Sequence, residues 1–491
     1  MITSTTTTAP TEKSYGRVST KPVKRFFVEM LTRDIAVEDA ILDLLDNCVD
    51  GILRNLTPKV VEDSLEADKG TPYTGFWAKI VVTGDMFEIE DNCGGIPWSE
   101  HDRAFRMGRP SPTSEQSNTN APLSVGAYGI GMKRAIFKIG NEAIIKTQNG
   151  EDSYQVPISA GWMSDENEWD LDVQVISSKM ESDGTRITIT GLDGGISERF
   201  SAEAFKDDLL DKIQSHYAVI IHKGFNVKVN GTVAKPNPLL FKFATTKVTT
   251  DEIRPFMFRS NYKGVDIFLA VGLREPIPDL ERTLEEQTGV QYSSDYAGWT
   301  VICNDRVVLY CNRDELTGWG TAGVPRYHTQ FIAISGVIEF RGDPTRLPTT
   351  TTKRGLDFSS AIYQQVLDRM REGTRLFTDF TNQWKARGEE ARTLVSPVST
   401  INYSTLRQEV RDIAFAQVRV GLEGEQYKPR LPEPPKNATD FRISYSREKS
   451  VVIQLAEEIL PEFEDLKEKD IRRKVGEASF DFAYKQLVEK A

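Results

Sequence analysis

Residues 35–54 read IAVEDAILDLLDNCVDGILR, and this segment sets the interpretation of the first half of the chain. Its apolar residues recur with the three-to-four-residue spacing of one face of an α-helix. That face consists of Val37, Ala40, Ile41, Leu44, Leu45 and Cys48. The opposite face carries Asp39, Asp43, Asp46, Asn47 and Asp50. The pattern predicts an amphipathic helix with one buried side and one side rich in oxygen atoms.

The acidic face of this helix has two interpretations, and the residues alone leave both open. The simpler one is a solvated surface. The other is a metal and water site, because carboxylate and amide oxygens suit Mg²⁺, which often arrives with a phosphate ligand. The amide of Asn47 could bind the ion without adding negative charge, and a second carboxylate could orient or deprotonate water.

The second motif is DNCGGIP at 91–97, directly after the predicted strands FWAKIVV and MFEIE. Glycines and a proline after a strand form a turn, and a plain turn is one interpretation. Glycine also lets a flat ligand approach the backbone closely. In that case the carboxylate of Asp91 could accept a hydrogen bond from an exocyclic amine such as that of adenine.

The third motif is GAYGIGMK at 126–133, between a polar segment at 108–124, expected to be a mobile loop, and a predicted helix. Amides at a helix N-terminus hold anions, and Lys133 adds positive charge. A Walker A loop is excluded because Met132 precedes the lysine and Arg134 follows it. A glycine-rich hinge remains the alternative interpretation.

Together, the order and spacing of the three motifs resemble those of the GHKL ATPase superfamily. This superfamily includes DNA gyrase B, the heat-shock chaperone ATPases, histidine kinases, MutL and MORC. AILDLLDNCVDG resembles its first box and DNCGGIP its adenine box, VGAYGIGMKRAIFKIG is similar to the lid-closing box of MORC proteins, and Gly184-Thr185 resembles the last box. The resemblance covers about 26–232 and implies that the chain binds ATP with Mg²⁺.

Carried over residue by residue, the resemblance implies that Asn47 binds Mg²⁺ and that Asp91 accepts the adenine amine with Thr185 behind it. The residues expected to contact the nucleotide are Asn47, Asp50, Asp91, Gly95, Ile96, Val125, Gly126, Ala127, Tyr128, Gly129, Ile130, Gly131, Met132, Lys133 and Thr185. The family's catalytic Glu is replaced by Asp43, which is one methylene shorter. A base about 1 Å too far from its water can lose about a hundredfold in rate. Slow hydrolysis, or ATP used mainly as a switch, is therefore expected.

The predicted fold class is α+β, in three parts that follow a disordered tail at 1–25. Residues 26–235 form a GHKL α/β sandwich, and 236–375 a smaller transducer-like α/β domain. Residues 376–491 form a helical region with a Pro-rich linker near 428–439. Within the second part, VICNDRVVLYC predicts a hairpin that turns at Asn304-Asp305.

The polar segment TTTTK at 349–353 resembles the loop by which transducer domains send a lysine to the γ-phosphate. On that resemblance Lys353 is a second catalytic candidate beside Asp43. A polar loop with a lysine is also a common surface feature, so this alternative stays open.

Composition narrows the class of protein. The net charge of −11 argues against a protein that coats nucleic acid through bulk charge, although residues 320–430 hold many basic side chains. The cysteines lack CxxC spacing, so a zinc site or disulfide framework is not expected. The N-terminus lacks the pattern of a signal peptide, and no apolar run is long enough for a membrane helix, so a cytoplasmic protein is expected.

The resemblance favours a MORC-like or MutL-like ATPase, a homodimer whose N-terminal domains pair on ATP and clamp a client, expected to be DNA. The resemblance to bacterial MORC-like ATPases also implies a role in a restriction or anti-phage system. A chaperone-like ATPase acting on a protein client and an ATP-gated scaffold with very slow turnover are the alternatives. The predicted helices at 446–460 and 466–490 either pack within the chain or dock a partner protein.

Overall fold

The structure, a computed structural model, describes residues 23–56, 72–106, 124–125, 129–244, 252–278, 293–350, 355–434, 447–461, 463 and 468–489. The chain divides into two compact units, Met1–Pro434 and Pro435–Ala491. Within the first unit we call the part up to residue 235 the N-terminal domain and the part from 236 to 434 the second domain. The tail expected at 1–25 lies outside the described residues except for its last three positions.

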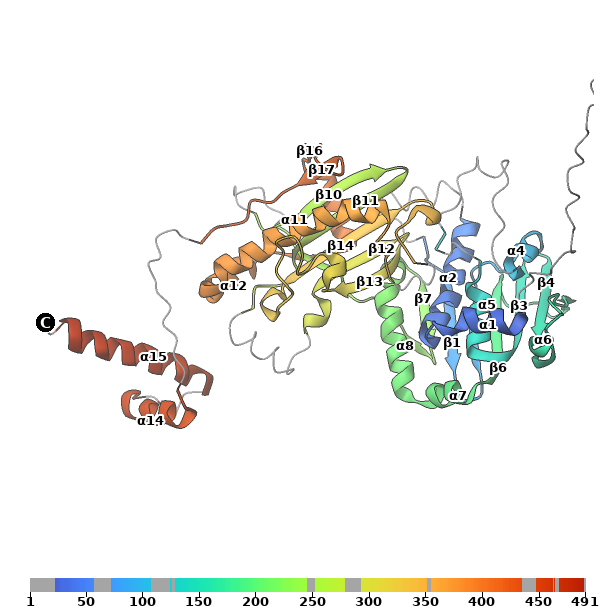
Figure 1. The fold of residues 1–491 in the computed structure, drawn as a ribbon, viewed down its shortest axis with the longest axis horizontal. Coiled ribbons are helices and arrows are strands. Elements are labelled where there is room, and N and C mark those ends of the chain that lie inside the picture. The colour runs from blue at the N-terminus through green and yellow to red at the C-terminus, as the bar shows by residue number, and fades with distance from the viewer. Residues whose placement is uncertain are drawn as a thin grey trace, which may run out of the picture. The chain divides into compact units, whose positions relative to one another are not determined.

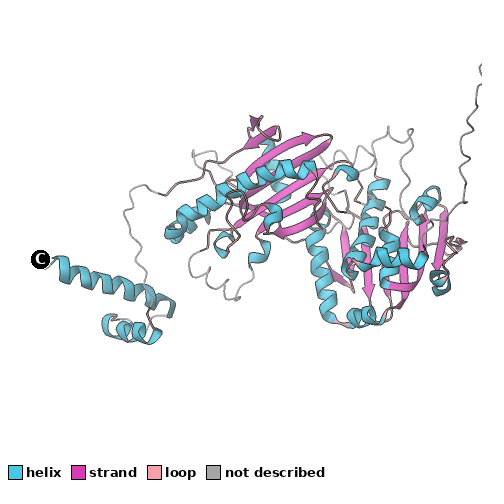
Figure 2. Cartoon of the chain, viewed as in Figure 1, coloured by secondary structure: helices cyan, strands magenta, loops and turns pink. Residues whose placement is uncertain are grey.

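The N-terminal domain is built on an eight-stranded mixed sheet (Figures 1 and 2) with the order β5-β4-β3-β6-β2-β1-β7-β8. Strands β1 and β7 are parallel, and all other neighbours are antiparallel. The strands are β1 (Trp77–Val82), β2 (Phe87–Asp91), β3 (Gly140–Asn149), β4 (Asp152–Ile158), β5 (Gln174–Val175), β6 (Gly184–Leu192), β7 (Asn226–Val229) and β8 (Thr232–Val233).

Helices cover only one face of this sheet. Along β1 and β2, buried side chains that point to the helices therefore alternate with more exposed side chains on the other face. On this other face, which we call the open face, Thr188 of β6 donates a hydrogen bond to Glu88 of the neighbouring strand β2. The helices are α1 (Lys24–Arg33), α2 (Val37–Asn55), η1 (Trp98–Glu100), α4 (His101–Phe105), α5 (Gly131–Ile139), α6 (Ala160–Ser164), α7 (Gly194–Ser201), α8 (Glu203–His216) and α9 (Ala218–His222). The predicted two-layer α/β sandwich is confirmed.

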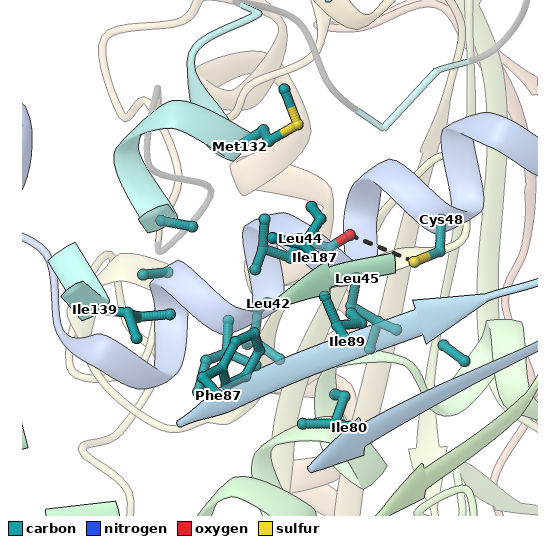
Figure 3. Close-up of a cluster of buried hydrophobic side chains, with 14 of the residues drawn as sticks. Leu42, Leu44, Leu45, Cys48, Ile80, Phe87, Ile89, Met132, Ile139 and Ile187 are labelled. Carbon is teal, nitrogen blue, oxygen red and sulfur yellow. Dashed lines mark hydrogen bonds between the residues drawn. The ribbon is translucent and has the colours of Figure 1, made fainter. Parts of the chain in front are cut away.

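Helix α2 lies at the centre of this core. Figure 3 shows Leu42 and Leu45 facing Phe87 and Ile89 of β2. The predicted apolar face is buried, which confirms the helical periodicity. Asp43 and Asp46 on the other side are also buried. The face that carries them is therefore buried at these two carboxylates, although Asn47 on the same face is exposed.

The second domain contains a seven-stranded sheet with the order β13-β12-β14-β11-β10-β17-β16, in which only β12 and β14 pair in parallel. Its strands are β10 (Phe256–Tyr262), β11 (Val265–Leu273), β12 (Gly298–Cys303), β13 (Arg306–Asn312), β14 (Ile334–Arg341), β16 (Ala416–Val418) and β17 (Gly424–Tyr427). A separate pair joins β9 (Leu240–Lys242) to β15 (Thr400–Asn402). The helices are α11 (Ala361–Trp384), α12 (Gly388–Val395) and α13 (Tyr403–Glu409), with 3-10 turns η2 (Ser293–Tyr296), η3 (Glu315–Thr317), η4 (Thr329–Phe331), η5 (Pro344–Arg346), η6 (Lys385–Arg387) and η7 (Val410–Asp412).

Both faces of the second sheet are buried, so its central strands are mostly apolar and are buried along almost their whole length. One face packs on α11, whose Met370 and Phe377 join the same cluster as Leu269 of β11. The other face packs on the N-terminal domain, because Val219 of α9 shares a cluster with Val337 of β14. This shared core explains why the two domains form one compact unit.

The division of the chain differs from the expected one. The sequence placed a boundary after residue 375, whereas the first unit extends to Pro434. Strand β17 pairs with β10 and completes the second sheet. Its sequence, GEQY, has no apolar alternation, which is why pattern alone assigned it to a helical region. The hairpin at Asn304-Asp305 is confirmed, with φ of 49° and 66° at the two turn residues.

The second compact unit is helical, as expected. Its helices are α14 (Lys449–Ile459) and α15 (Glu468–Tyr484), followed by a π-helical turn at Lys485–Glu489. They enclose a small apolar cluster of Ala456, Leu460, Ile471 and Val475. Across all the described residues, no helix combines the length and the apolar character that spanning a bilayer requires.

Candidate functional site

Asp91 ends strand β2 as a buried carboxylate. Its Oδ1 accepts the backbone N–H of Cys93 at 2.7 Å and that of Thr185 at 3.4 Å, and the Cys48 thiol donates to its Oδ2 at 3.4 Å. Burial raises the pKa of Asp91 to about 6, although these hydrogen bonds oppose the shift. The group is thus an ionised acceptor at neutral pH in surroundings that disfavour its charge, which suits an amine donor.

The turn after Asp91 fits closely against the sheet. Gly95 has a φ of 64°, and a Cβ there would lie 2.0 Å from the carbonyl oxygen of Gln148. A side chain is therefore excluded on both conformational and steric grounds. The guanidinium of Arg54 on α2 donates to the Gly95 carbonyl at 2.6 Å, which ties the helix to the turn. The predicted contact residue Ile96 follows, and its N–H donates to Thr147 Oγ1 at 2.8 Å.

Thr147 and Thr185 stand opposite each other on β3 and β6. Their hydroxyl oxygens are 3.3 Å apart, and the Thr147 hydroxyl also donates to the Gly184 carbonyl at 3.3 Å. Thr185 thus reaches Asp91 through its backbone N–H, while its hydroxyl meets Thr147. The structure brings Asp91, Ile96 and Thr185 together. Thr147 was not among the expected site residues, because it belongs to no motif and is recognisable only from the register of β3 and β6.

On α2, the candidate base Asp43 is paired with an arginine. The Arg134 guanidinium donates to Asp43 Oδ2 through Nε at 3.1 Å and through a terminal nitrogen, and both side chains are buried. Gly131 permits the close approach of α5, because a Cβ there would lie 3.3 Å from Asp43 Cβ. The N-terminus of α5 therefore adjoins the helix that carries Asp43. Arg134 was not among the site residues expected from the sequence, where it only helped to exclude a Walker A loop.

The other polar residues of α2 differ in what they contact. Asn47 is exposed and Asp50 is half-buried. Asp50 Oδ1 accepts the N–H of Val125 at 2.6 Å, which fixes the segment just before the glycine loop. Asp46 is buried and contacts Tyr217 and Arg306. Asn47 is thus the α2 side chain of this set that a solvated metal ion can reach.

The glycine loop is described only at its end, since Gly126, Ala127 and Tyr128 lie outside the described residues. Gly129 has a φ of 69°, and Ile130 precedes the first turn of α5. Met132 is buried in the core of the domain. Lys133 is also buried, and its Nζ donates to the carbonyls of Ala104 at 2.7 Å and Gly129 at 2.6 Å. In this conformation Lys133 joins α4 to the loop.

The candidate Lys353 lies outside the described residues. The ends of its loop are nevertheless joined, because Thr349 bridges to Leu356 and the Thr350 N–H donates to the Gly355 carbonyl at 3.1 Å. Strand β14 leads directly into this segment through η5.

The donor set fits ATP better than it fits a metal held by protein alone. Among the described residues, no group of three or more His, Cys, Asp or Glu side chains is arranged to hold an ion. Mg²⁺ commonly keeps several waters and binds through one or two protein groups plus substrate phosphates. An exposed Asn47 beside the N-terminus of α5 matches that division, with one protein group for the ion and a helix end for phosphates, while Asp91 offers an acceptor to an amine.

Two comparisons with known proteins bear on this site. No curated protein matches the chain. Residues 35–188 match the family model described as Histidine kinase-, DNA gyrase B-, and HSP90-like ATPase. The match runs from just before α2 into β6, so it includes Asp43, Asn47, Asp91 and Thr185. Residues 35–188 are therefore similar to the ATPase domain that this family model describes.

Proposed function

We propose that the protein binds ATP with Mg²⁺ in its N-terminal domain and hydrolyses it slowly, using the nucleotide as a switch. The observation that carries the proposal is the buried, ionised Asp91, held by the N–H groups of Cys93 and Thr185. Asp91 accepts the adenine amine, and the start of α5 holds the phosphates. Asn47 holds the Mg²⁺, which when bound offsets the negative charge of the phosphates.

Slow hydrolysis follows from the surroundings of Asp43. A general base must accept a proton from the attacking water. The Arg134 guanidinium already donates to Asp43 Oδ2, and the aspartate is shorter than the glutamate of the family. Water activation at Oδ2 therefore requires Arg134 to move. This supports an enzyme that retains ATP long enough for the nucleotide to act as a signal.

We further propose that two copies pair through their N-terminal domains when ATP is bound, in the cytoplasm, as a MORC-like or MutL-like clamp with DNA as the client. In this proposal the second domain acts as the transducer and Lys353 reaches the γ-phosphate. The core shared by α9 and β14 supports the link between domains. Arg341 is buried in ion pairs, so basic contacts with DNA would come from exposed residues such as Arg326 and Arg375.

The pairing of Asp43 with Arg134 specifically favours one alternative, an ATP-gated scaffold with very slow turnover. A chaperone-like role remains the other alternative, and only the acidic composition supports it. These candidates share the ATP site and differ in client and rate.

Binding is tested by calorimetry with ATP and Mg²⁺, and assembly by light scattering with a non-hydrolysable analogue. Wild type should bind the nucleotide and gain mass or change shape. Asp91→Asn should bind the nucleotide about ten- to a hundredfold more weakly and should need correspondingly more of it for the same change. Asp85→Asn, which alters an exposed acid on the β1–β2 turn, should behave as wild type. Wild type that binds no nucleotide would refute the proposal, and binding without a change in mass or shape would refute the clamp.

The clients are separated by a second experiment. DNA binding that appears only with the analogue and weakens steeply with salt supports the clamp. Stimulation of turnover by unfolded protein instead supports the chaperone. If Asp43→Asn abolishes a measurable ATPase activity while nucleotide affinity is unchanged, the scaffold with negligible turnover is excluded.

A further inference from the structure

The tip of the β12–β13 hairpin is buried against the N-terminal domain. The exposed fractions of Asn304, Asp305 and Arg306 are 4%, 2% and 4%. Turn residues are ordinarily at the surface, where water satisfies their polar groups. Burial of three consecutive polar side chains therefore requires partners, and each residue finds its partners in a different part of the molecule.

Arg306 contacts the nucleotide-site helix α2. Its Nε donates to Asp46 Oδ1 at 2.9 Å, and its guanidinium lies 4.3 Å from the ring centroid of Tyr217. The Tyr217 hydroxyl donates to the same Oδ1 at 2.6 Å. Asp46 directly precedes Asn47 and lies one helical turn after Asp43. A side chain of the second domain thus holds the helix that carries both candidate groups.

The backbone beside this ion pair is also shared. Arg306 donates to the carbonyl of His216 at 3.0 Å, and the His216 ring lies 2.8 Å from the carbonyl oxygen of Val307. Burial and the nearby Arg306 lower the pKa of His216 to about 4. The ring is therefore neutral at pH 7, and its Nδ1–H donates to Val307. The end of α8 and the start of β13 thus each donate a hydrogen bond to a carbonyl of the other.

Asp305 makes a second buried set of contacts. It accepts hydrogen bonds from Tyr73 at 3.0 Å, from Lys223 at 2.9 Å and from Arg341 at 2.8 Å. Burial alone would raise the pKa of Asp305, but Lys223 and Arg341 outweigh it and lower the pKa to about 2. Its charge is therefore constant over the physiological range, and the contact does not depend on pH there.

Asn304 joins the two segments that flank the phosphate site. Its Nδ2 donates to the Ser124 carbonyl at 3.2 Å and to the Gly342 carbonyl at 2.9 Å. Ser124 precedes Val125, which Asp50 holds, and Gly342 follows β14 at the start of the segment that leads to Lys353. One amide thus joins the residue before Val125 in one domain to the residue that follows β14 in the other.

We propose that this hairpin tip transmits the state of the nucleotide site to the second domain, with Arg306 as a positioning residue that sets α2 through Asp46. The inference rests on the proposed ATP function. Buried ion pairs contribute little net stability compared with apolar packing, yet breaking one is strongly unfavourable, so they favour discrete arrangements. Movement of α2 on nucleotide binding must therefore carry the hairpin with it or break the pair.

The test measures a distance between the two domains. All four cysteines are buried, so spin labels can be placed at Val175→Cys and Val420→Cys, whose native side chains are 89% and 83% exposed. In wild type, a non-hydrolysable ATP analogue should shift the distance distribution. In Arg306→Met the analogue should bind within about threefold of wild type, but the shift should be lost. Its kcat should fall about tenfold with KM little changed, because positioning rather than binding is impaired.

Two further variants separate positioning from simple destabilisation. Arg306→Lys retains a charged donor and should restore most of the shift and of kcat. Arg199→Met breaks the ion pair of α2 with α7 at Glu38, within the N-terminal domain, and should leave the shift intact. A folded Arg306→Met protein with the full shift and wild-type kcat would overturn the proposal.

If Arg306→Met fails to fold, Asn304→Gly decides the question. Asn304 has a φ of 49°, which glycine adopts without strain, so this change removes only the contacts to Ser124 and Gly342. The proposal expects a reduced shift, and an unchanged shift would contradict it. Analogue that binds wild type without any shift overturns the coupling but leaves the ATP function standing, whereas analogue that fails to bind refutes the ATP function itself.

Discussion

The two ends of the proposed nucleotide site, one assigned to the adenine and one to the phosphates, are held in different ways. Asp91, Thr147 and Thr185 lie on neighbouring strands of one sheet, and their hydrogen bonds stay within it. On α2, by contrast, Asp43 is paired with Arg134 of α5, and Asp46 with Arg306 of the second domain. The proposed contact with the base is thus built from one sheet. The arrangement of the phosphate end depends instead on α5 and on the second domain.

The largest expected effect on stability is at the phosphate end, which we call the distributed end because its contacts come from distant segments; the adenine end is the local end. Arg134→Met removes the guanidinium partner of the buried Asp43, and breaking a buried ion pair costs about 3–5 kcal/mol of unfolding free energy. Chemical denaturation measures this change. Arg199→Met, whose arginine is half exposed, is the matched control and should cost about 1 kcal/mol or less. Equal losses of unfolding free energy in the two variants would show that the buried Asp43–Arg134 pair stabilises the fold no more than a half-exposed pair.

At the local end, Asp91→Asn should weaken ATP binding about ten- to a hundredfold, the equivalent of one hydrogen bond to a charged group. The fold should persist, because asparagine keeps an Oδ1 for the N–H groups of Cys93 and Thr185. Titration calorimetry measures the affinity, and circular dichroism checks the fold. An Asp91→Asn protein with wild-type affinity would remove the adenine contact from the proposal.

The pH dependence of binding sharpens the same point. Between pH 7 and pH 5 the ionised fraction of Asp91 falls, since its pKa is about 6, and the affinity for adenosine should fall about tenfold. Adenosine is used instead of ATP because it has no phosphate groups whose own titration would alter the affinity. Asp91→Asn should show no such fall, and a fall of the same size in that variant would assign the titration to another group.

The stability of the free protein should change with pH in the opposite direction. Burial raises the folded-state pKa of Asp91 above its unfolded value, so the folded state binds the proton more tightly. This contribution is fully present below the unfolded pKa near 4 and is lost as the pH rises through about 6. Thermal melts of wild type minus Asp91→Asn should therefore favour the variant more at pH 7.5 than at pH 5.

The smallest effect is expected from Thr147→Val. The change removes the hydroxyl that accepts the Ile96 N–H and meets Thr185, at a cost of about 1 kcal/mol, or about fivefold in ATP affinity. Thr188→Val, which loses a hydroxyl on the open face of the sheet, is the matched control and should leave the affinity unchanged. Equal affinity in both variants would limit the local network to Asp91 and Thr185.

The features that the sequence could predict are those contained in one short segment. They are the turn that follows Asp91 and the helical periodicity of α2. The pairs at the distributed end span 91 positions for Asp43 with Arg134 and 260 for Asp46 with Arg306. No spacing rule connects residues so far apart. The short strand β17 escaped prediction because its neighbour β10 lies far away in sequence and its own residues show no alternation.

The core shared by α9 and the second sheet limits how the chain can be divided. Ala218 and Val219 of α9 are buried against Met257, Phe268 and Val337 of the second domain. A fragment that ends near residue 235 would leave this face of α9 open to water, together with the carboxylate of Asp46 that Arg306 now covers. Exposed apolar patches promote association between molecules. The N-terminal domain thus shares its core with the second domain, and a fragment cut near residue 235 is expected to associate more readily than one that extends to Pro434.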